Sequence, residues 1–197
     1  MTPMETALRL DHETHTYWIG GRQVPGYSQI VRDLGVAPDN PFYTDAGREE
    51  GIALHKWVAF LATGKESTTP PDPRIAGRVE GIRKFLRDTG FRVVGAELPQ
   101  YDPVSGFACT PDIWGFIGAW SWTIDTKRGA KLPTHRLQTA AQVIALRANG
   151  FRARKRGALY LRDNDYRLDE HNDIDDEPRW KAIVAAYHAK QFYAKVG

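Results

Sequence analysis

The chain has 197 residues, 42% hydrophobic and 26% charged, with a formal net charge of +3; this suits one globular domain with a sizeable core and permits, without demanding, a nucleic-acid partner. Its single cysteine excludes an internal disulfide framework and any zinc ribbon or iron–sulfur cluster held by one chain. No apolar run is long enough to cross a bilayer and the N-terminus lacks a secretory pattern, so we expect no membrane partner.

In chain order, the sequence first predicts a small β unit and then helices. Residues 14–19 alternate and are rich in β-formers, and Gly20-Gly21 makes a two-residue turn. A loop with Pro38 and Pro41 precedes a long helix. The expected elements are strands 14–19 and 22–24, helices 28–34, 44–62 and 74–89, strands 91–101, 107–117 and 121–127, helix 134–148, strands 156–161 and 166–168, and helix 176–195.

This order predicts an α/β fold. We expect a mixed central sheet of about four to six strands flanked by helices, with a small N-terminal β element. The chain shows no internal repeat and no linker composition, so residues 1–197 are interpreted as a single domain.

The turns of the central β region fix which residues face one another. If residues 118–119 form a two-residue hairpin loop, counting back along both strands pairs Asp112 with Asp125. A four-residue loop at 103–106 likewise pairs Glu97 with Asp112. Three carboxylates then lie in a row across neighbouring strands, unless a bulge shifts the register.

Lys127 lies two residues after Asp125 and shares its face of the strand. Like charges facing each other across a sheet are unfavourable, and a bound divalent cation is the strongest reason to gather them, since carboxylate oxygens suit Mg²⁺ or Mn²⁺. With a lysine alongside, such a site has the parts that phosphodiester hydrolysis needs. The alternative is a set of solvated carboxylates on a half-exposed sheet, and the short Asp-x-Lys tripeptide alone does not decide between the two.

Several short segments resemble one nuclease superfamily in their order and spacing. They are Gly-Phe-Ala-Cys-Thr-Pro-Asp at 106–112, Ile-Asp-Thr-Lys at 124–127 and Leu-Gln-Thr-Ala-Ala-Gln at 137–142, preceded by a Gly-x-x-x-His element at 51–55. This set resembles the PD-(D/E)xK nucleases, in particular the RecB-like and phage-exonuclease branch. One departure is Gln142, which stands where that branch often has the tyrosine of Gln-x-x-x-Tyr.

The resemblance implies a restriction-endonuclease-like core and a role for each matched residue. Asp112, Asp125 and Lys127 would form the catalytic centre, with Lys127 orienting the attacking water or stabilising the transition state, and Gln138 would lie near it. Without the resemblance, His55 is more simply interpreted as a structural histidine. The implied ligands of Mg²⁺ or Mn²⁺ are His55, Glu97, Asp112, Asp125 and the backbone carbonyl of Thr126.

Basic and aromatic residues near these motifs are candidates for DNA contacts. Arg128, Lys131 and Arg136 follow the catalytic lysine and are expected to contact phosphates. Trp114 shares the predicted face of Asp112 and is a candidate for stacking on a base, although core packing is the commoner fate of such a residue.

The function expected from these residues and the resemblance is a metal-dependent deoxyribonuclease, an exonuclease rather than an endonuclease, that serves DNA recombination or end processing. The same branch implies a possible single-strand annealing protein as partner, a possible ring-shaped oligomer, and a cytoplasmic location, in the host cell if the chain is phage-encoded. The alternative is a nuclease-fold module that binds DNA or protein without cutting, and a third interpretation is an RNA-directed or defence-related nuclease.

Overall fold

The computed structural model describes residues 7–36, 44–65 and 67–195. The loop expected around Pro38 and Pro41 lies outside these residues. The strands are β1 (Arg9–Asp11), β2 (Thr16–Ile19), β3 (Arg22–Val24), β4 (Arg92–Ala96), β5 (Gln100–Asp102), β6 (Phe107–Cys109), β7 (Ile113–Ile117), β8 (Trp120–Lys127), β9 (Lys155–Arg162) and β10 (Asp165–Glu170). The helices are α1 (Tyr27–Asp33), α2 (Asp45–Ala62), α3 (Ala76–Thr89), α4 (Thr134–Ala148) and α5 (Asp176–Tyr193).

Five strands form the central sheet in the order β10-β9-β8-β7-β4. Neighbours are antiparallel except β8 and β9, which run parallel, so the sheet is mixed. Parallel neighbours need a crossover, and α4 supplies it between β8 and β9. The α/β class with a mixed central sheet flanked by helices is therefore confirmed, together with a small N-terminal sheet, β1-β2-β3.

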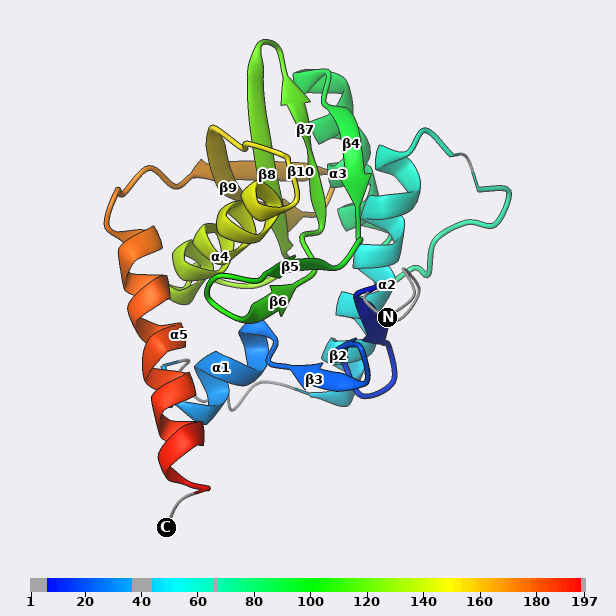
Figure 1. Ribbon diagram of the computed structural model, residues 1–197. Coiled ribbons are helices and arrows are strands. Elements are labelled where there is room, and N and C mark those ends of the chain that lie inside the picture. The colour runs from blue at the N-terminus through cyan, green and yellow to red at the C-terminus, as the bar shows by residue number, and fades with distance from the viewer. Residues whose placement is uncertain (1–6, 37–43, 66, 196–197) are drawn as a thin grey trace.

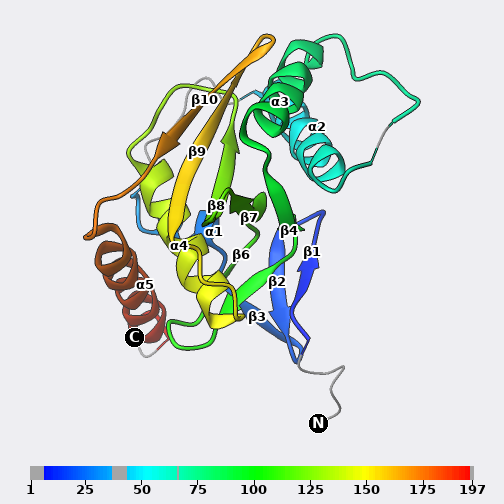
Figure 2. The same cartoon turned by 90° about the horizontal axis from the view of Figure 1, so that it is seen from above.

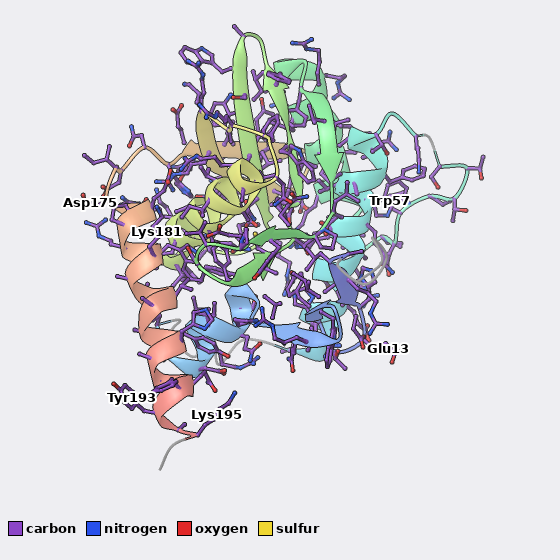
Figure 3. All side chains as sticks on the ribbon, in the orientation of Figure 1. Glu13, Trp57, Asp175, Lys181, Tyr193 and Lys195 are labelled. Atoms are coloured by element: carbon purple, nitrogen blue, oxygen red, sulfur yellow. The ribbon has the colours of Figure 1, made fainter. Side chains whose placement is uncertain are left out.

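Helices cover both faces of the central sheet. One face packs on α2 and α3 through an apolar cluster that includes Val58, Phe85 and Ile124. The other face packs on α4, with α1 and α5 beyond it (Figure 1 and Figure 2). Trp57 on α2 and Asp175 at the start of α5 lie at opposite sides of the molecule (Figure 3). A strand in the middle of these layers, such as β8, is buried along nearly its whole length.

Two strands that the sequence predicts as continuous are interrupted. Residues 91–101 form β4 and β5, and residues 107–117 form β6 and β7. Prolines at 99 and 111 lie in the breaks, where a residue without a backbone N–H cannot continue a ladder. Glu97 adds a left-handed backbone with φ of 50°, which turns the chain away from β4. β5 and β6 then pair as a separate two-stranded sheet, which lies below the central one in the view of Figure 1.

The N-terminal part differs slightly from expectation. The sequence predicts two strands there, and the structure adds β1, which pairs with β2. This small sheet is joined to the rest by the Tyr17 hydroxyl, which lies 2.9 Å from Thr110 Oγ1, two residues before Asp112. Among the described residues, no helix is long and apolar enough to span a membrane.

Candidate active site

The strands beside the three carboxylates pair in the register that the loop lengths predict. β4, β7 and β8 are neighbours, and their last pairs, Ala96 with Ile113 and Ile113 with Ile124, lie one residue from Glu97, Asp112 and Asp125. A bulge falls further along β4, between Val93 and Gly95, and does not disturb these ends. The turn pairs that set the register are Asp102 with Phe107 and Ile117 with Trp120, as the sequence predicts.

The side chains of Asp112 and Asp125 nevertheless point to different sides of the sheet. Asp112 lies in a bend just before β7 and directs Oδ1 to His55 of α2, at 3.1 Å from Nδ1. Asp125 lies within β8 and its Oδ1 accepts a hydrogen bond from Gln142 Nε2 of α4, at 2.8 Å. A residue in a bend is not bound by strand alternation, so in-register pairing did not fix the direction of Asp112.

The first half of the site is a group of two carboxylates around one imidazole. His55 Nδ1 lies 3.1 Å from Glu97 Oε1 and 3.1 Å from Asp112 Oδ1. Ligand atoms of these three residues lie within 4.8 Å of one another. His55 reaches them from α2, whose start is capped by Thr44 through a hydrogen bond of 3.0 Å from Gly47 N to Thr44 Oγ1.

Thr126 holds the carboxylate of Asp112 in place through two hydrogen bonds. Asp112 Oδ2 accepts hydrogen bonds from Thr126 N at 2.6 Å and from Thr126 Oγ1 at 2.5 Å. The Asp112 residue is 3% exposed. With Oδ2 occupied by two donors, Oδ1 is the oxygen left to face His55 and Glu97.

Charge and burial shift the pKa values of this group in opposite directions. The negative charge of Asp112, which outweighs burial, raises the pKa of His55 well above its ordinary value. Burial alone would raise the pKa of Asp112, but the charge and hydrogen bond of His55 and the charge of Lys127 lower it. Burial is also the main reason that the pKa of Glu97 is raised. In the protein without metal, a proton on His55 therefore balances the charge of Asp112.

The second half of the site is the ion pair of Asp125 and Lys127. Lys127 Nζ lies 2.5 Å from Asp125 Oδ2 and donates a hydrogen bond to Gln138 Oε1 at 2.8 Å. Asp125 is fully buried, and the Lys127 ammonium faces its Oδ2. Burial raises the pKa of Asp125, and the charge of Asp112 adds to this, while Lys127 opposes both.

The donor set at this site could hold a divalent cation. Two carboxylates and one imidazole nitrogen, from Glu97, Asp112 and His55, lie within 4.8 Å of one another, and Asp125 carries a third, buried carboxylate on the neighbouring strand β8. Carboxylate oxygens suit Mg²⁺ and Mn²⁺, and an imidazole nitrogen favours Mn²⁺ of the two. The alternative of solvated carboxylates on a half-exposed sheet is wrong for Asp112 and Asp125, which are 3% and 0% exposed.

The residues expected to contact DNA are found in varied settings. Arg128 donates to Glu50 Oε2 at 3.1 Å, and Lys131 Nζ lies 3.0 Å from Asp169 Oδ2. Arg136 pairs with Asp173 and Asp176 before α5 and in its first turn. The expectation for Trp114 needs correction, because the residue is only 5% exposed and its indole covers the backbone of Gly95 on the neighbouring strand. A buried indole offers no face for a base.

Two polar residues at the site were not predicted from the sequence. Gln142 is 1% exposed and bonds Asp125, and Thr123, 0% exposed, bonds Gln142. The sequence does mark Gln142 as unusual, because it stands where the RecB-like and phage-exonuclease branch often has a tyrosine. A buried glutamine four residues after Gln138 lies on the same helix face, which is the spacing that would have identified it.

Comparison with known proteins gives structural likenesses only. No protein-family model and no curated protein matches the chain. It is similar to the crystal structure of an alkaline exonuclease from Laribacter hongkongensis, with 16% identity over 85% of this chain and 93% of that one and a TM-score of 0.47. The same enzyme with dAMP gives 14% identity, 88% and 95% coverage and a TM-score of 0.48. The protein SSO0001 gives 14% identity, 82% coverage of both chains and a TM-score of 0.39. Likenesses at this level carry no functional argument.

Proposed function

We propose that this chain is a divalent-metal-dependent nuclease that hydrolyses phosphodiester bonds in DNA. The observation that carries the proposal is the group of His55, Glu97 and Asp112, whose ligand atoms lie within 4.8 Å of one another, next to the strand that carries the Asp125–Lys127 ion pair; Asp112 and Asp125 are 3% and 0% exposed. Buried like charges destabilise a fold unless a cation balances them. Together with a lysine, they make a site suited to phosphate chemistry.

The roles within the site follow from its contacts. His55, Glu97, Asp112 and Asp125 would hold Mg²⁺ or Mn²⁺, with the Thr126 carbonyl as a further oxygen. A divalent ion bound there supplies Lewis-acid polarisation of the phosphate and lowers the pKa of water. Thr126 keeps Asp112 in place through the two hydrogen bonds to Oδ2.

Lys127 is the residue proposed to act on the reacting atoms. Its ammonium lies between Asp125 Oδ2 and Gln138 Oε1, so the side chain is held at both sides and 19% exposed. From there it orients the attacking water or stabilises the negative charge that develops on the phosphate. Gln138 acts through Lys127, because its amide oxygen accepts the ammonium hydrogen bond.

The substrate and the mode of cleavage extend the same proposal. The resemblance to the RecB-like and phage-exonuclease branch favours DNA as substrate and an exonuclease, acting in recombination or end processing beside a single-strand annealing protein. Arg128, Lys131 and Arg136 remain proposed phosphate contacts. Each is partnered by a carboxylate in the structure, and DNA would have to compete with Glu50, Asp169, or Asp173 and Asp176.

Cleavage of end-labelled DNA tests the proposal. End-labelled linear and single-stranded DNA, together with nicked and closed circular DNA, are incubated with Mg²⁺, Mn²⁺ or EDTA. The proteins compared are the wild type, Lys127→Ala and a control, Lys84→Ala. The control removes a lysine of α3 that pairs with Asp165 of β10, away from the site. We expect metal-dependent cleavage by the wild type and the control, and loss of cleavage in Lys127→Ala. Cleavage of linear but not closed circular DNA identifies an exonuclease. If the wild type binds DNA and cuts none of these substrates with either metal, the non-cutting binding module replaces the nuclease.

A further inference from the structure

Helix α4 presents two glutamines, one turn apart, to the two motif residues of β8. Gln138 Oε1 accepts the Lys127 ammonium at 2.8 Å, and Gln142 Nε2 donates to Asp125 Oδ1 at 2.8 Å. Residues i and i+4 of a helix lie on one face about 6 Å apart, and residues i and i+2 of a strand lie on one face at a similar separation of about 6.6 Å. The two glutamines of α4 can therefore face Asp125 and Lys127 of β8 one to one. Each glutamine thus contacts a different member of the Asp125–Lys127 pair.

The amide of Gln142 is oriented by a third residue. Thr123 Oγ1 donates to Gln142 Oε1 at 3.3 Å, from the same face of β8 as Asp125. With the amide oxygen engaged by a hydroxyl, the amide nitrogen is the end that faces Asp125. All three residues are buried, so water does not compete with these hydrogen bonds.

Packing does not require an amide at this position. Gln142 is among the largest fully buried side chains of the protein, and an apolar side chain of the same length would fill its space without a polar group to satisfy. An N–H donor aimed at a carboxylate, in contrast, favours its charged form and fixes its rotation. The effect of the chain Thr123–Gln142–Asp125 is to engage Oδ1 and leave Oδ2 on the side of Lys127.

We propose that Gln142 is a positioning residue that fixes the carboxylate of Asp125, through an amide that Thr123 orients, so that Oδ2 is presented for metal binding beside Lys127. The inference rests on the proposed nuclease function and deepens it. Gln142 does not touch the reacting atoms and acts only through Asp125. Partners of this kind typically change metal affinity or activity by about 10–100-fold when removed.

The test combines metal binding with kinetics in the full chain. Gln142→Met keeps the length of the side chain and removes the amide. Thr123→Val removes the hydroxyl that orients it, and Thr123→Ser restores that hydroxyl. The matched control is Gln29→Met on α1, which removes a part-buried amide that donates to Tyr187 Oη of α5, away from β8. The dissociation constant of Mn²⁺ is measured by calorimetry, kcat and KM by cleavage of DNA, and folding by circular dichroism.

The expected result for Gln142→Met is an Mn²⁺ dissociation constant raised by about 10–100-fold and a kcat lowered on the same order, with KM for DNA almost unchanged. Thr123→Val should lie between this variant and the wild type. Thr123→Ser should recover most of the wild-type affinity, and Gln29→Met should match the wild type in both affinity and kcat.

Several outcomes overturn the inference. Wild-type Mn²⁺ affinity and kcat in folded Gln142→Met would overturn it while leaving the nuclease intact. If Gln142→Met fails to fold, the Thr123 pair decides, and equal affinities in the valine and serine variants would overturn it. Equal losses in Gln29→Met would reveal general destabilisation instead. If the wild type binds Mn²⁺ without cutting DNA, the affinities alone decide. If it neither binds Mn²⁺ nor cuts, the proposed function fails and the inference fails with it.

Discussion

Removal of the Lys127 ammonium should destabilise the metal-free protein far more than removal of the Asp125 charge. Lys127→Met leaves a fully buried carboxylate without its neighbouring cation. Asp125→Asn, in contrast, removes one negative charge from a crowded group and leaves a lysine that is 19% exposed and still bonded to Gln138. The asymmetry follows from the difference in burial, because desolvation penalises an unpaired charge most where no water reaches it.

The magnitude follows from the geometry of the pair. At the observed 2.5 Å, Coulomb attraction at an effective dielectric constant of about 20 is roughly 7 kcal/mol before desolvation is subtracted. Breaking a buried pair by removing one partner typically costs about 3–5 kcal/mol. Because Lys127 retains some exposure, we expect about 3 kcal/mol for Lys127→Met and about 1 kcal/mol or less for Asp125→Asn.

The loss should also depend on pH. Burial already raises the pKa of Asp125, and without Lys127 it rises further. A carboxyl whose folded pKa lies above its unfolded value keeps its proton in the folded protein. Its destabilising effect therefore accumulates as pH rises from the unfolded pKa through the folded one. Lys127→Met should accordingly be least destabilised, relative to wild type, at about pH 5 and most destabilised at about pH 8.

Urea unfolding in EDTA at these two pH values measures the effect for the wild type, both single variants and the double variant. The double variant should be more stable than Lys127→Met at about pH 8, because it no longer buries an unpaired charge. A loss for Lys127→Met that is the same at both pH values, or no greater than that of Asp125→Asn, would refute this reasoning.

Other predictions concern the metal group and two glycines. Because the charge of Asp112 raises the pKa of His55, the stability that protonated His55 gives the metal-free protein is present below its unfolded pKa and is lost as pH rises through the folded pKa. Mn²⁺ must displace that proton, so its affinity should rise with pH up to the folded pKa, with proton release seen by calorimetry in buffers of different ionisation enthalpy; a pH-independent affinity would contradict this. Gly51→Ala should raise the free energy of unfolding by about 0.5–1 kcal/mol, since an added methyl meets open space within α2. Gly95→Ala should lower it by about 1–3 kcal/mol, since the Trp114 ring occupies the place of the methyl. Urea unfolding measures the free energy of unfolding of both variants. An equal change in the two variants would show that the Trp114 indole moves aside freely.

The register of the strands beside the carboxylates could be predicted from the sequence alone. Loop lengths at 103–106 and 118–119 set the pairing of the β-hairpins, and the observed pairs follow the predicted count up to the residues next to Glu97, Asp112 and Asp125. The order of helices and strands likewise predicted the α/β class and the long helix that carries His55. These are local properties, since turn geometry and the spacing of residues along one strand are written in a short stretch of chain.

The directions and depths of the side chains depended on the tertiary structure. Strand alternation assigned Trp114 a face but not its burial, because helices that cover both faces come from distant parts of the chain. The bend at Asp112 turned its carboxylate toward α2 instead of α4. Gln142 became a partner of Asp125 only when the crossover laid α4 on β8. Sequence spacing determines which residues share a strand or a helix face, while the packing of separate elements decides which of those faces meet and exclude water.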